Sequence, residues 1–171
     1  MEYDLKYNEQ PDEFATDLTI QSRLRKYVDK HFYPAFAISM LCPIYLMGGA
    51  IRDLLMAKKP KDLDFVIVGE EHKEWVLKVF KKFNIDYTFN RFGGFRINYH
   101  GTKIDLWLTD DLFSSLEYNV DGLYYDLRNN NMLSLTFKDF TENGLKLVNP
   151  ENNIAKGREL KLAKFAEEYH H

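Results

Sequence analysis

Three things are scarce in this sequence, and each scarcity narrows what the protein can be. Cys42 is the single cysteine, so neither an intramolecular disulfide nor a metal site made of several cysteines can form. The longest apolar stretch, residues 35–47, is interrupted by Ser39 and Pro43 and is too short to cross a bilayer. Positive charge is not in excess, because the formal net charge is -3. A surface that is basic everywhere is therefore excluded, although a local basic patch is not.

The composition is that of a globular protein. Hydrophobic residues make up 45% and aromatic residues 15% of the 171 residues, which is enough for one core. We therefore expect a single domain over residues 1–171, with the polar residues 1–15 loosely packed. Residues 1–10 hold three acidic side chains and no apolar segment, which is unlike a secretory signal. We expect a cytoplasmic protein without a membrane partner.

The most informative stretch begins with a pair of glycines. An apolar run at residues 44–47 predicts a strand that leads into Gly48 and Gly49. Glycine has no Cβ, so this turn can be tight and a ligand can approach its backbone closely. Apolar side chains then recur at helical spacing over residues 51–55. Arg52 stands in the first helical turn, where its guanidinium can form charge-assisted bonds to phosphate. The pattern predicts a strand, turn and helix that hold an anion.

Closely spaced aspartates follow on the next predicted strand. Asp62 and Asp64 are two positions apart, so both carboxylates point to the same face of that strand. Like charges this close repel, and a divalent cation with oxygen ligands relieves the repulsion. Asp105 alternates with apolar neighbours in a later strand, residues 102–108, and projects from one face of it. If the two strands are neighbours, three carboxylates converge. Otherwise Asp105 is a surface aspartate on a half-buried strand.

Together these motifs resemble the head domain of the tRNA nucleotidyltransferase and bacterial poly(A) polymerase family, a branch of the polymerase-beta-like nucleotidyltransferases. That family has two glycines, then Arg-Asp and a leucine pair, and then Lys-Asp-x-Asp on a strand. The matching positions are Gly48, Gly49, Arg52, Asp53, Leu54, Leu55, Lys61, Asp62 and Asp64. The resemblance implies an α/β (α+β) fold, with a mixed sheet of about five strands, helices on one main face and the active cleft on the other.

The resemblance also implies an activity, the metal-dependent transfer of a nucleoside monophosphate from a nucleoside triphosphate to an acceptor hydroxyl, with release of pyrophosphate. The catalytic residues, which would also ligate Mg²⁺ or Mn²⁺, are Asp62, Asp64 and Asp105. The nucleotide would be held by Gly48, Gly49, Arg52, Asp53 and Lys61, with Asp53 bracing Arg52 or the start of the helix. The acceptor stays open between an RNA 3′ end, a small molecule and a protein. CCA addition to tRNA uses neck residues and a body, neither of which we expect here.

One segment, within residues 110–127, departs from the family pattern. In the family this segment reads Arg-Asp-Phe-Thr-x-Asn-Ala, and in the tRNA enzymes it helps to hold the nucleotide. Here Leu116 stands for the arginine, Glu117 for the aspartate and Asp121 for the asparagine. A second hypothesis therefore stays open, in which the chain is a catalytically silent nucleotide- or RNA-binding module of the same fold.

Hydrophobic spacing predicts the remaining elements. The dipeptide His100-Gly101, with glycine second, predicts a two-residue hairpin loop. Residues 154–169 resemble the start of the family's neck helix, with Arg158, Lys161 and Lys164 on a basic edge. The other expected helices are 20–28, 70–83 and two short pieces in 110–127, and the other expected strands are 85–90, 93–99, 132–138 and 144–148.

Overall fold

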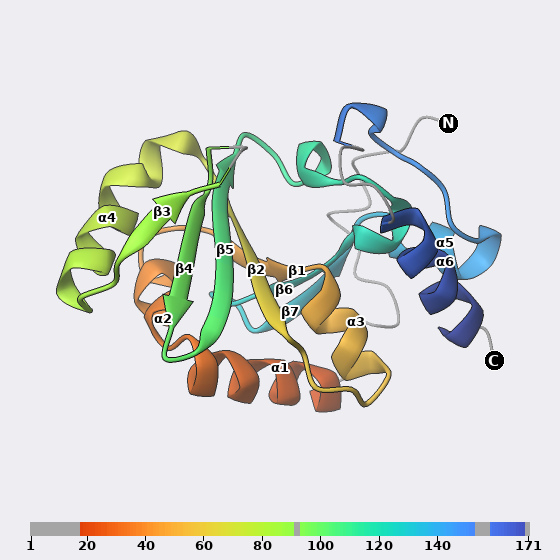
Figure 1. The fold of residues 1–171 in the computed structure, drawn as a ribbon, viewed down its shortest axis with the longest axis horizontal. Coiled ribbons are helices and arrows are strands. Elements are labelled where there is room, and N and C mark those ends of the chain that lie inside the picture. The colour runs from red at the N-terminus through yellow and green to blue at the C-terminus, as the bar shows by residue number, and fades with distance from the viewer. Residues whose placement is uncertain (1–17, 91–92, 153–157, 170–171) are drawn as a thin grey trace.

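A seven-stranded sheet organises the protein in the computed structural model, which describes residues 18–90, 93–152 and 158–169 (Figure 1). The strands are β1 (Ile44–Met47), β2 (Asp62–Val68), β3 (Tyr87–Phe89), β4 (Phe95–Tyr99), β5 (Thr102–Thr109), β6 (Leu123–Asp126) and β7 (Asn131–Ser134). They lie in the order β3-β4-β5-β2-β1-β6-β7. β2 and β5 run parallel and the other neighbouring pairs run antiparallel, so the sheet is mixed, as expected.

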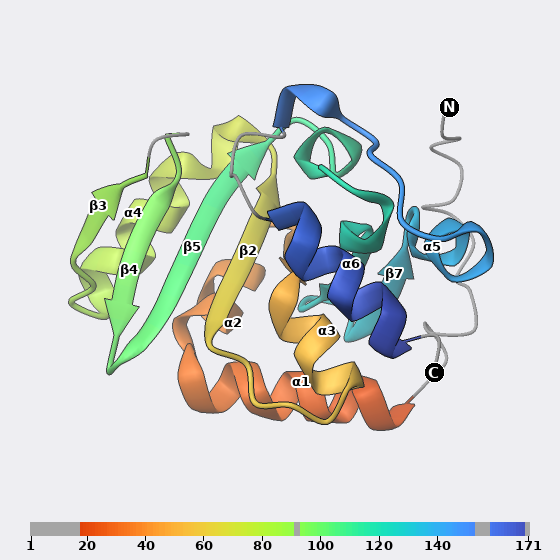
Figure 2. The same cartoon turned by 45° about the vertical axis from the view of Figure 1, so that its right-hand side comes forward.

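Helices α1 (Leu18–His31), α2 (Pro34–Ser39) and α4 (Lys73–Lys82) pack against the core side of the sheet; in Figure 1 α1 lies below the strands and α4 at the left edge. The main hydrophobic core lies between these helices and β2 and β5, because alternate residues of the two strands are buried against it. The strand residues that contribute are Leu63, Phe65, Ile104 and Leu106. Helix α3 (Gly49–Leu55) follows β1, and α6 (Arg158–Tyr169) lies in front of α3 in Figure 2.

The sheet has two strands more than expected from the family resemblance, and one of them, β6, comes from a segment expected to be helical. Leu123, Tyr124 and Tyr125 are all buried in β6, between β1 and β7. Tyr124 belongs to the cluster on the open face and Tyr125 to the main core. A strand buried on both faces shows no alternation, so its apolar run cannot be distinguished from a helix by periodicity. The helical prediction for this part of residues 110–127 was wrong.

The C-terminal strand pair is also corrected. Residues 132–138 form β7 only as far as Ser134, and residues 144–148 contribute no more than an isolated bridge between Tyr118 and Leu147. Between them lies helix α5 (Phe137–Asn143), which buries Phe137 and Phe140 one turn apart. This spacing of three is the helical signal that the strand prediction passed over.

The hairpin loop between β4 and β5 is confirmed. His100 and Gly101 both have positive φ, 49° and 89°, which is the backbone of a type I′ turn. Residues 1–15 and the first part of the predicted helix 154–169 lie outside the described residues. Among the described helices, none is long and apolar enough to cross a membrane.

Candidate active site

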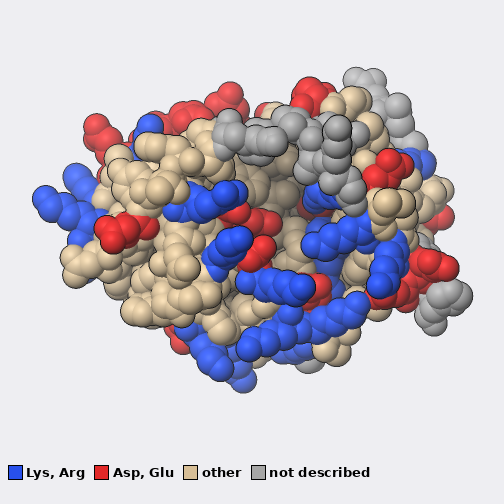
Figure 3. Space-filling view, viewed as in Figure 1, with Lys and Arg blue, Asp and Glu red and all other residues tan. Residues whose placement is uncertain are grey.

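The face of the sheet opposite α1, α2 and α4 carries a cavity of about 570 Å³. β2 and β5 form its floor, β4 lies on one side, and Gly48, the segment 114–121 and the start of α6 lie on the other. The space-filling view shows acidic side chains inside a hollow in the middle of this face, with Lys and Arg side chains around it (Figure 3). The cavity is therefore an acidic pocket with a partly basic rim.

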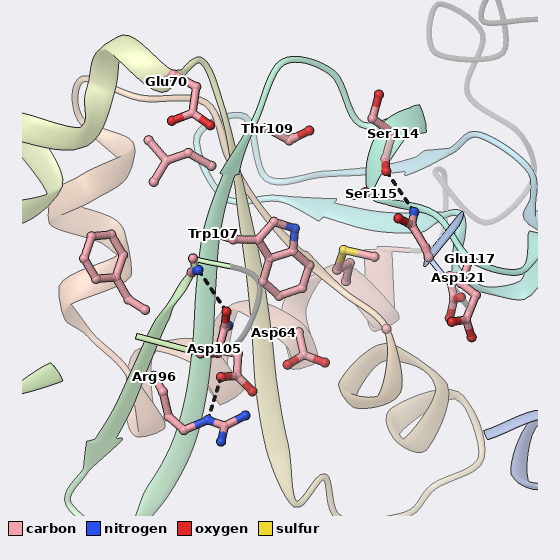
Figure 4. A pocket seen from close by; sticks show the side chains of 18 of the residues that line it. Asp64, Glu70, Arg96, Asp105, Trp107, Thr109, Ser114, Ser115, Glu117 and Asp121 are labelled. Atoms are coloured by element: carbon pink, nitrogen blue, oxygen red, sulfur yellow. Dashed lines mark hydrogen bonds and ion pairs between the residues drawn. The ribbon is translucent and has the colours of Figure 1, made fainter. Parts of the chain in front are cut away.

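Two of the three predicted carboxylates lie next to each other on this floor. β2 and β5 are parallel neighbours, and Asp64 is directly opposite Asp105 (Figure 4). Burial, together with the charges of Asp105 and Asp62, raises the pKa of Asp64 to about 7. Ionising a carboxylate with such a pKa near neutral pH costs free energy, because burial and the neighbouring negative charges both disfavour its charged form. A bound cation would remove that cost.

The third carboxylate, Asp62, lies two residues before Asp64 on β2. It is exposed and pairs in register with Lys103, and it does not line the cavity. The carboxylate of Asp105 meanwhile accepts a bond from Arg96 Nε at 3.3 Å. In the ranges that the structure describes, no three acidic, His or Cys side chains are gathered tightly enough to hold a metal ion. Convergence of all three aspartates on one metal stays a prediction.

The donor set nevertheless suits a hard divalent cation. Asp64 and Asp105 supply carboxylate oxygens, the ligands that Mg²⁺ and Mn²⁺ prefer. Burial and the charges of Asp105 and Asp62 disfavour the ionised form of Asp64, and a cation bound beside it would favour that form. Gly48 lies alongside, since a Cβ at this position would come within 3.4 Å of Asp64 Oδ2. Two acidic side chains and a glycine backbone thus lie side by side at the cavity.

The glycine turn has the backbone that its residues predict. Gly48 has φ 77°, a conformation that other residues rarely adopt, and Gly49 begins α3. The guanidinium of Arg52 returns to this turn, because its Nη2 lies 3.7 Å from where a Cβ of Gly49 would be. Gly48 lines the cavity, whereas Gly49 and Arg52 lie just behind its wall.

Arg52 already has an acidic partner in the structure. Its Nη1 donates to Asp121 Oδ1 at 3.0 Å, with side chains that are 11% and 2% exposed. Asp121 is the residue that replaces the family's asparagine. The guanidinium that was predicted to bind phosphate is therefore already paired with a buried carboxylate.

Arg158 of α6 completes this cluster. Its Nη2 donates to Asp121 Oδ1 at 2.7 Å and its Nη1 donates to Glu117 Oε1 at 2.6 Å. Burial raises the pKa of Asp121, but Arg52 and Arg158 outweigh it and bring that pKa below its usual value. The sequence analysis treated Arg158 as part of a basic edge and missed its role. The one available signal was the pair of acidic residues, Glu117 and Asp121, at positions where the family differs.

The remaining predicted residues lie outside the cavity. Lys61 is exposed in the loop before β2. Asp53 lies near the phenol of Tyr27, and in the described part of the chain it makes no hydrogen bond or ion pair with Arg52. Asp121, not Asp53, braces the arginine. The roles proposed for Lys61 and Asp53 stay predictions.

Comparison with known proteins bears on the fold and the family of this chain. A CCA tRNA nucleotidyltransferase from Francisella novicida is 47% identical over 38 residues, which make up 22% of this chain and 45% of that protein. A CCA-adding enzyme in complex with ATP has a similar fold, with a TM-score of 0.58 and 17% identity over 78% of this chain and 37% of its own.

The Thermotoga maritima CCA-adding enzyme complexed with tRNA is 19% identical, with a TM-score of 0.54 over 87% of this chain and 37% of its own. The chain thus spans less than half the length of each of these relatives. The model of the poly A polymerase head domain matches residues 44–155, which is well over half of the chain. The chain therefore belongs to the poly A polymerase head domain family, a family of nucleotidyltransferases.

Proposed function

We propose that this chain is a catalytic head that transfers a nucleoside monophosphate from a nucleoside triphosphate to an acceptor hydroxyl and releases pyrophosphate. The observation that carries the proposal is the pairing of Asp64 with Asp105 beside the Gly48 turn. Membership of a nucleotidyltransferase family supports it independently. We further propose RNA as the acceptor, because relatives of the same fold are complexes with ATP, CTP and tRNA.

The residues of the chain divide the work of such a transfer. Asp64 and Asp105, with Asp62 at the edge, would hold Mg²⁺ or Mn²⁺. When bound, the metal supplies charge stabilisation on the phosphate oxygens and lowers the pKa of the acceptor hydroxyl. The Gly48-Gly49 turn offers backbone close to the triphosphate, and Arg52 offers a fixed positive charge behind it. The protein then has to position the hydroxyl in line with the phosphorus, since phosphoryl transfer demands little covalent chemistry from side chains.

A second function is favoured by the cluster around Asp121. In it two arginines and two acids, Glu117 and Asp121, sum to zero charge, so that side of the pocket offers no net attraction to a triphosphate. A head in this state could bind a nucleotide or RNA without turning it over. The alternative is therefore a catalytically silent binding module with the same fold.

The deciding experiment compares the parent protein with the variant that combines Asp62→Asn and Asp64→Asn. Each is incubated with Mg²⁺ or Mn²⁺, each nucleoside triphosphate in turn and a mixture of labelled RNA acceptors, and pyrophosphate release is measured. We expect the parent to release pyrophosphate and the variant to lose at least about 10²-fold in rate, because the metal carries most of the charge stabilisation. Asp86→Asn, at an exposed aspartate outside the cavity, is the matched control and keeps the parental rate.

Thermal melting separates the two functions. Metal plus nucleotide raises the melting midpoint of any protein that binds them in the folded state. A parent that shows the shift without pyrophosphate release is a silent module. A parent that shows neither contradicts both functions.

A further inference from the structure

A tryptophan stands in the cavity beside the two aspartates, and nothing in the proposed chemistry uses it. Trp107 is two residues after Asp105 on β5, so the alternation of the strand places both side chains on the same face. Trp107 lines the cavity and stays partly exposed. Figure 4 shows its indole above the sheet, between the aspartates and the segment that carries Ser114 and Ser115. A large aromatic surface is therefore available within the pocket.

The position of this indole is built into the sheet. Trp107 pairs with Val66 of β2 and contacts the small apolar cluster on the open face. On the other side Gly94 packs against it so closely that a Cβ there would come within 2.9 Å of Trp107 Cβ. The base of the side chain is thus clamped between a neighbouring strand and the start of β4. The backbone and Cβ from which the indole projects are therefore fixed by the sheet, so the ring has only its own side-chain rotations left to lose when it stacks on a ligand.

The indole N–H of Trp107 donates no hydrogen bond to any residue that the structure describes. The N–H of Trp75, the other tryptophan, donates to the carbonyl of Ile38 at 3.2 Å. A tryptophan placed only for packing normally finds such a partner when it is buried. Trp107 instead lines the cavity, where both its ring and its N–H can contact a ligand.

The order of the elements indicates which ligand meets Trp107. Across the open face lie Arg96 on β4, then Asp105 and Trp107 on β5, then Asp64 on β2, and then Gly48 before α3. If the leaving phosphates lie at the Gly48 turn, the attacking hydroxyl has to come from the opposite side of the phosphorus, because the displacement is in line. That opposite side is the one with Trp107.

We propose that Trp107 is a stacking platform for the terminal base of an RNA acceptor and so determines that the acceptor is a nucleic-acid end. This inference rests on the proposed function, because that function places the phosphates at Gly48. Stacking on tryptophan tolerates any base, since every base has a π-face. The unpaired indole N–H adds one hydrogen bond to whatever acceptor atom lies beside the ring.

The test measures binding of two five-nucleotide RNAs by fluorescence anisotropy, in Mg²⁺ and without triphosphate. One ends in cytidine, and the other has the same sequence with an abasic 3′ nucleotide. We expect the parent to bind the complete RNA about tenfold more tightly, which is the size of one base–aromatic stack. Trp107→Leu should reduce this preference to less than twofold, and Trp107→Phe, which keeps a ring, should retain most of it.

Binding of Mg²⁺-ATP by the same variants shows which base is stacked. Trp107→Leu should change that affinity by less than about twofold. A variant that keeps the preference for the complete RNA overturns the proposal, and so does one that loses ATP affinity instead, because the triphosphate's own base would then lie on Trp107. A parent that binds RNA with this preference but never releases pyrophosphate refutes the proposed function and leaves the platform standing.

A second measurement covers the case in which Trp107→Leu does not fold. In the Trp75→Phe background, Trp107 is the only tryptophan, and a stacked base quenches its fluorescence. The complete RNA should quench this emission at saturation, and the abasic RNA should not. Equal quenching by the two RNAs overturns the proposal.

Discussion

The two sides of the pocket differ in how their buried charges are balanced. On β2 and β5, Asp64 faces Asp105, and the pKa of Asp64 is raised to about 7. Beside α6, Asp121 lies between Arg52 and Arg158, and its pKa is lowered although its side chain is more buried than the partly exposed Asp64. The ionised form of the same residue type is thus disfavoured on one side of the pocket and favoured on the other. The neighbours decide the direction, because burial raises the pKa of both carboxylates and only that of Asp121 is outweighed by paired arginines.

This difference separates function from structure within one site. The aspartate pair costs the folded protein free energy, which is common at functional sites, and under the proposed function a bound cation would remove that cost. The cluster around Asp121 is already complete, and it fastens α6 to the segment 117–121. We therefore interpret it as a structural contact between α6 and the wall of the cavity. Variants that disturb the two sides should differ in what they damage.

The largest expected effect on stability belongs to Asp121→Ala. Removing this carboxylate leaves the buried Arg52 without its partner and takes two bonds from Arg158. Breaking a buried ion pair by deleting one member costs about 3–5 kcal/mol. We expect urea denaturation to show a loss of that size. Asp86→Ala, at an exposed aspartate, is the control and should stay within about 0.5 kcal/mol of the parent. A loss below about 1 kcal/mol for Asp121→Ala would mean that the cluster does not hold α6.

Acid should produce the next largest effect, through the same residue. The pKa of Asp121 is lowered in the folded protein, so its ionised form stabilises the fold at every pH above the unfolded value of about 3.9. That contribution is lost as the pH falls from the unfolded pKa through the lower folded pKa. Melting midpoints measured from pH 6 downward should therefore fall less steeply below pH 4 for Asp121→Asn than for the parent. Parallel curves would show that Asp121 is not stabilised by the arginines.

How far the sequence could predict these two sides depends on how local their signals are. Asp64 and Asp105 each lie in a short alternating strand, and the periodicity alone gives the face on which each side chain lies. The adjacency of their strands came from the family resemblance, since the parallel pairing of β2 and β5 joins residues far apart in the chain. The glycine turn and the hairpin at His100 were predictable because positive φ strongly selects the residue type.

The other side of the pocket had no such signal. Arg158 meets Asp121 across 37 positions of sequence, and that meeting depends on where α6 packs. On a helix that carries other basic residues, nothing local distinguishes the one that turns inward. The sequence showed only that Glu117 and Asp121 depart from the family motif, and the structure adds that the two acids pair with Arg158. β6 was also missed because its signal depends on tertiary packing. Its residues are buried on both faces of the sheet, so they do not show the alternation of apolar and polar side chains that marks a strand.

The smallest expected effect tests the open side, at the pair that joins Arg96 to Asp105. Arg96 Nε lies 3.3 Å from Asp105 Oδ1, and the side chains are 58% and 30% exposed. Exposed ion pairs contribute about 0–1 kcal/mol, so Arg96→Gln should change the free energy of unfolding by less than that. It should also tighten Mn²⁺ binding a few-fold in calorimetric titration, because the positive charge that competes with a cation for Asp105 is gone. Lys138→Gln, which breaks the exposed pair with Glu142 far from the aspartates, is the matched control and should leave Mn²⁺ binding unchanged. Weaker Mn²⁺ binding by Arg96→Gln would contradict this expectation. It would mean that Arg96 positions the carboxylate of Asp105 instead of competing with the cation for it.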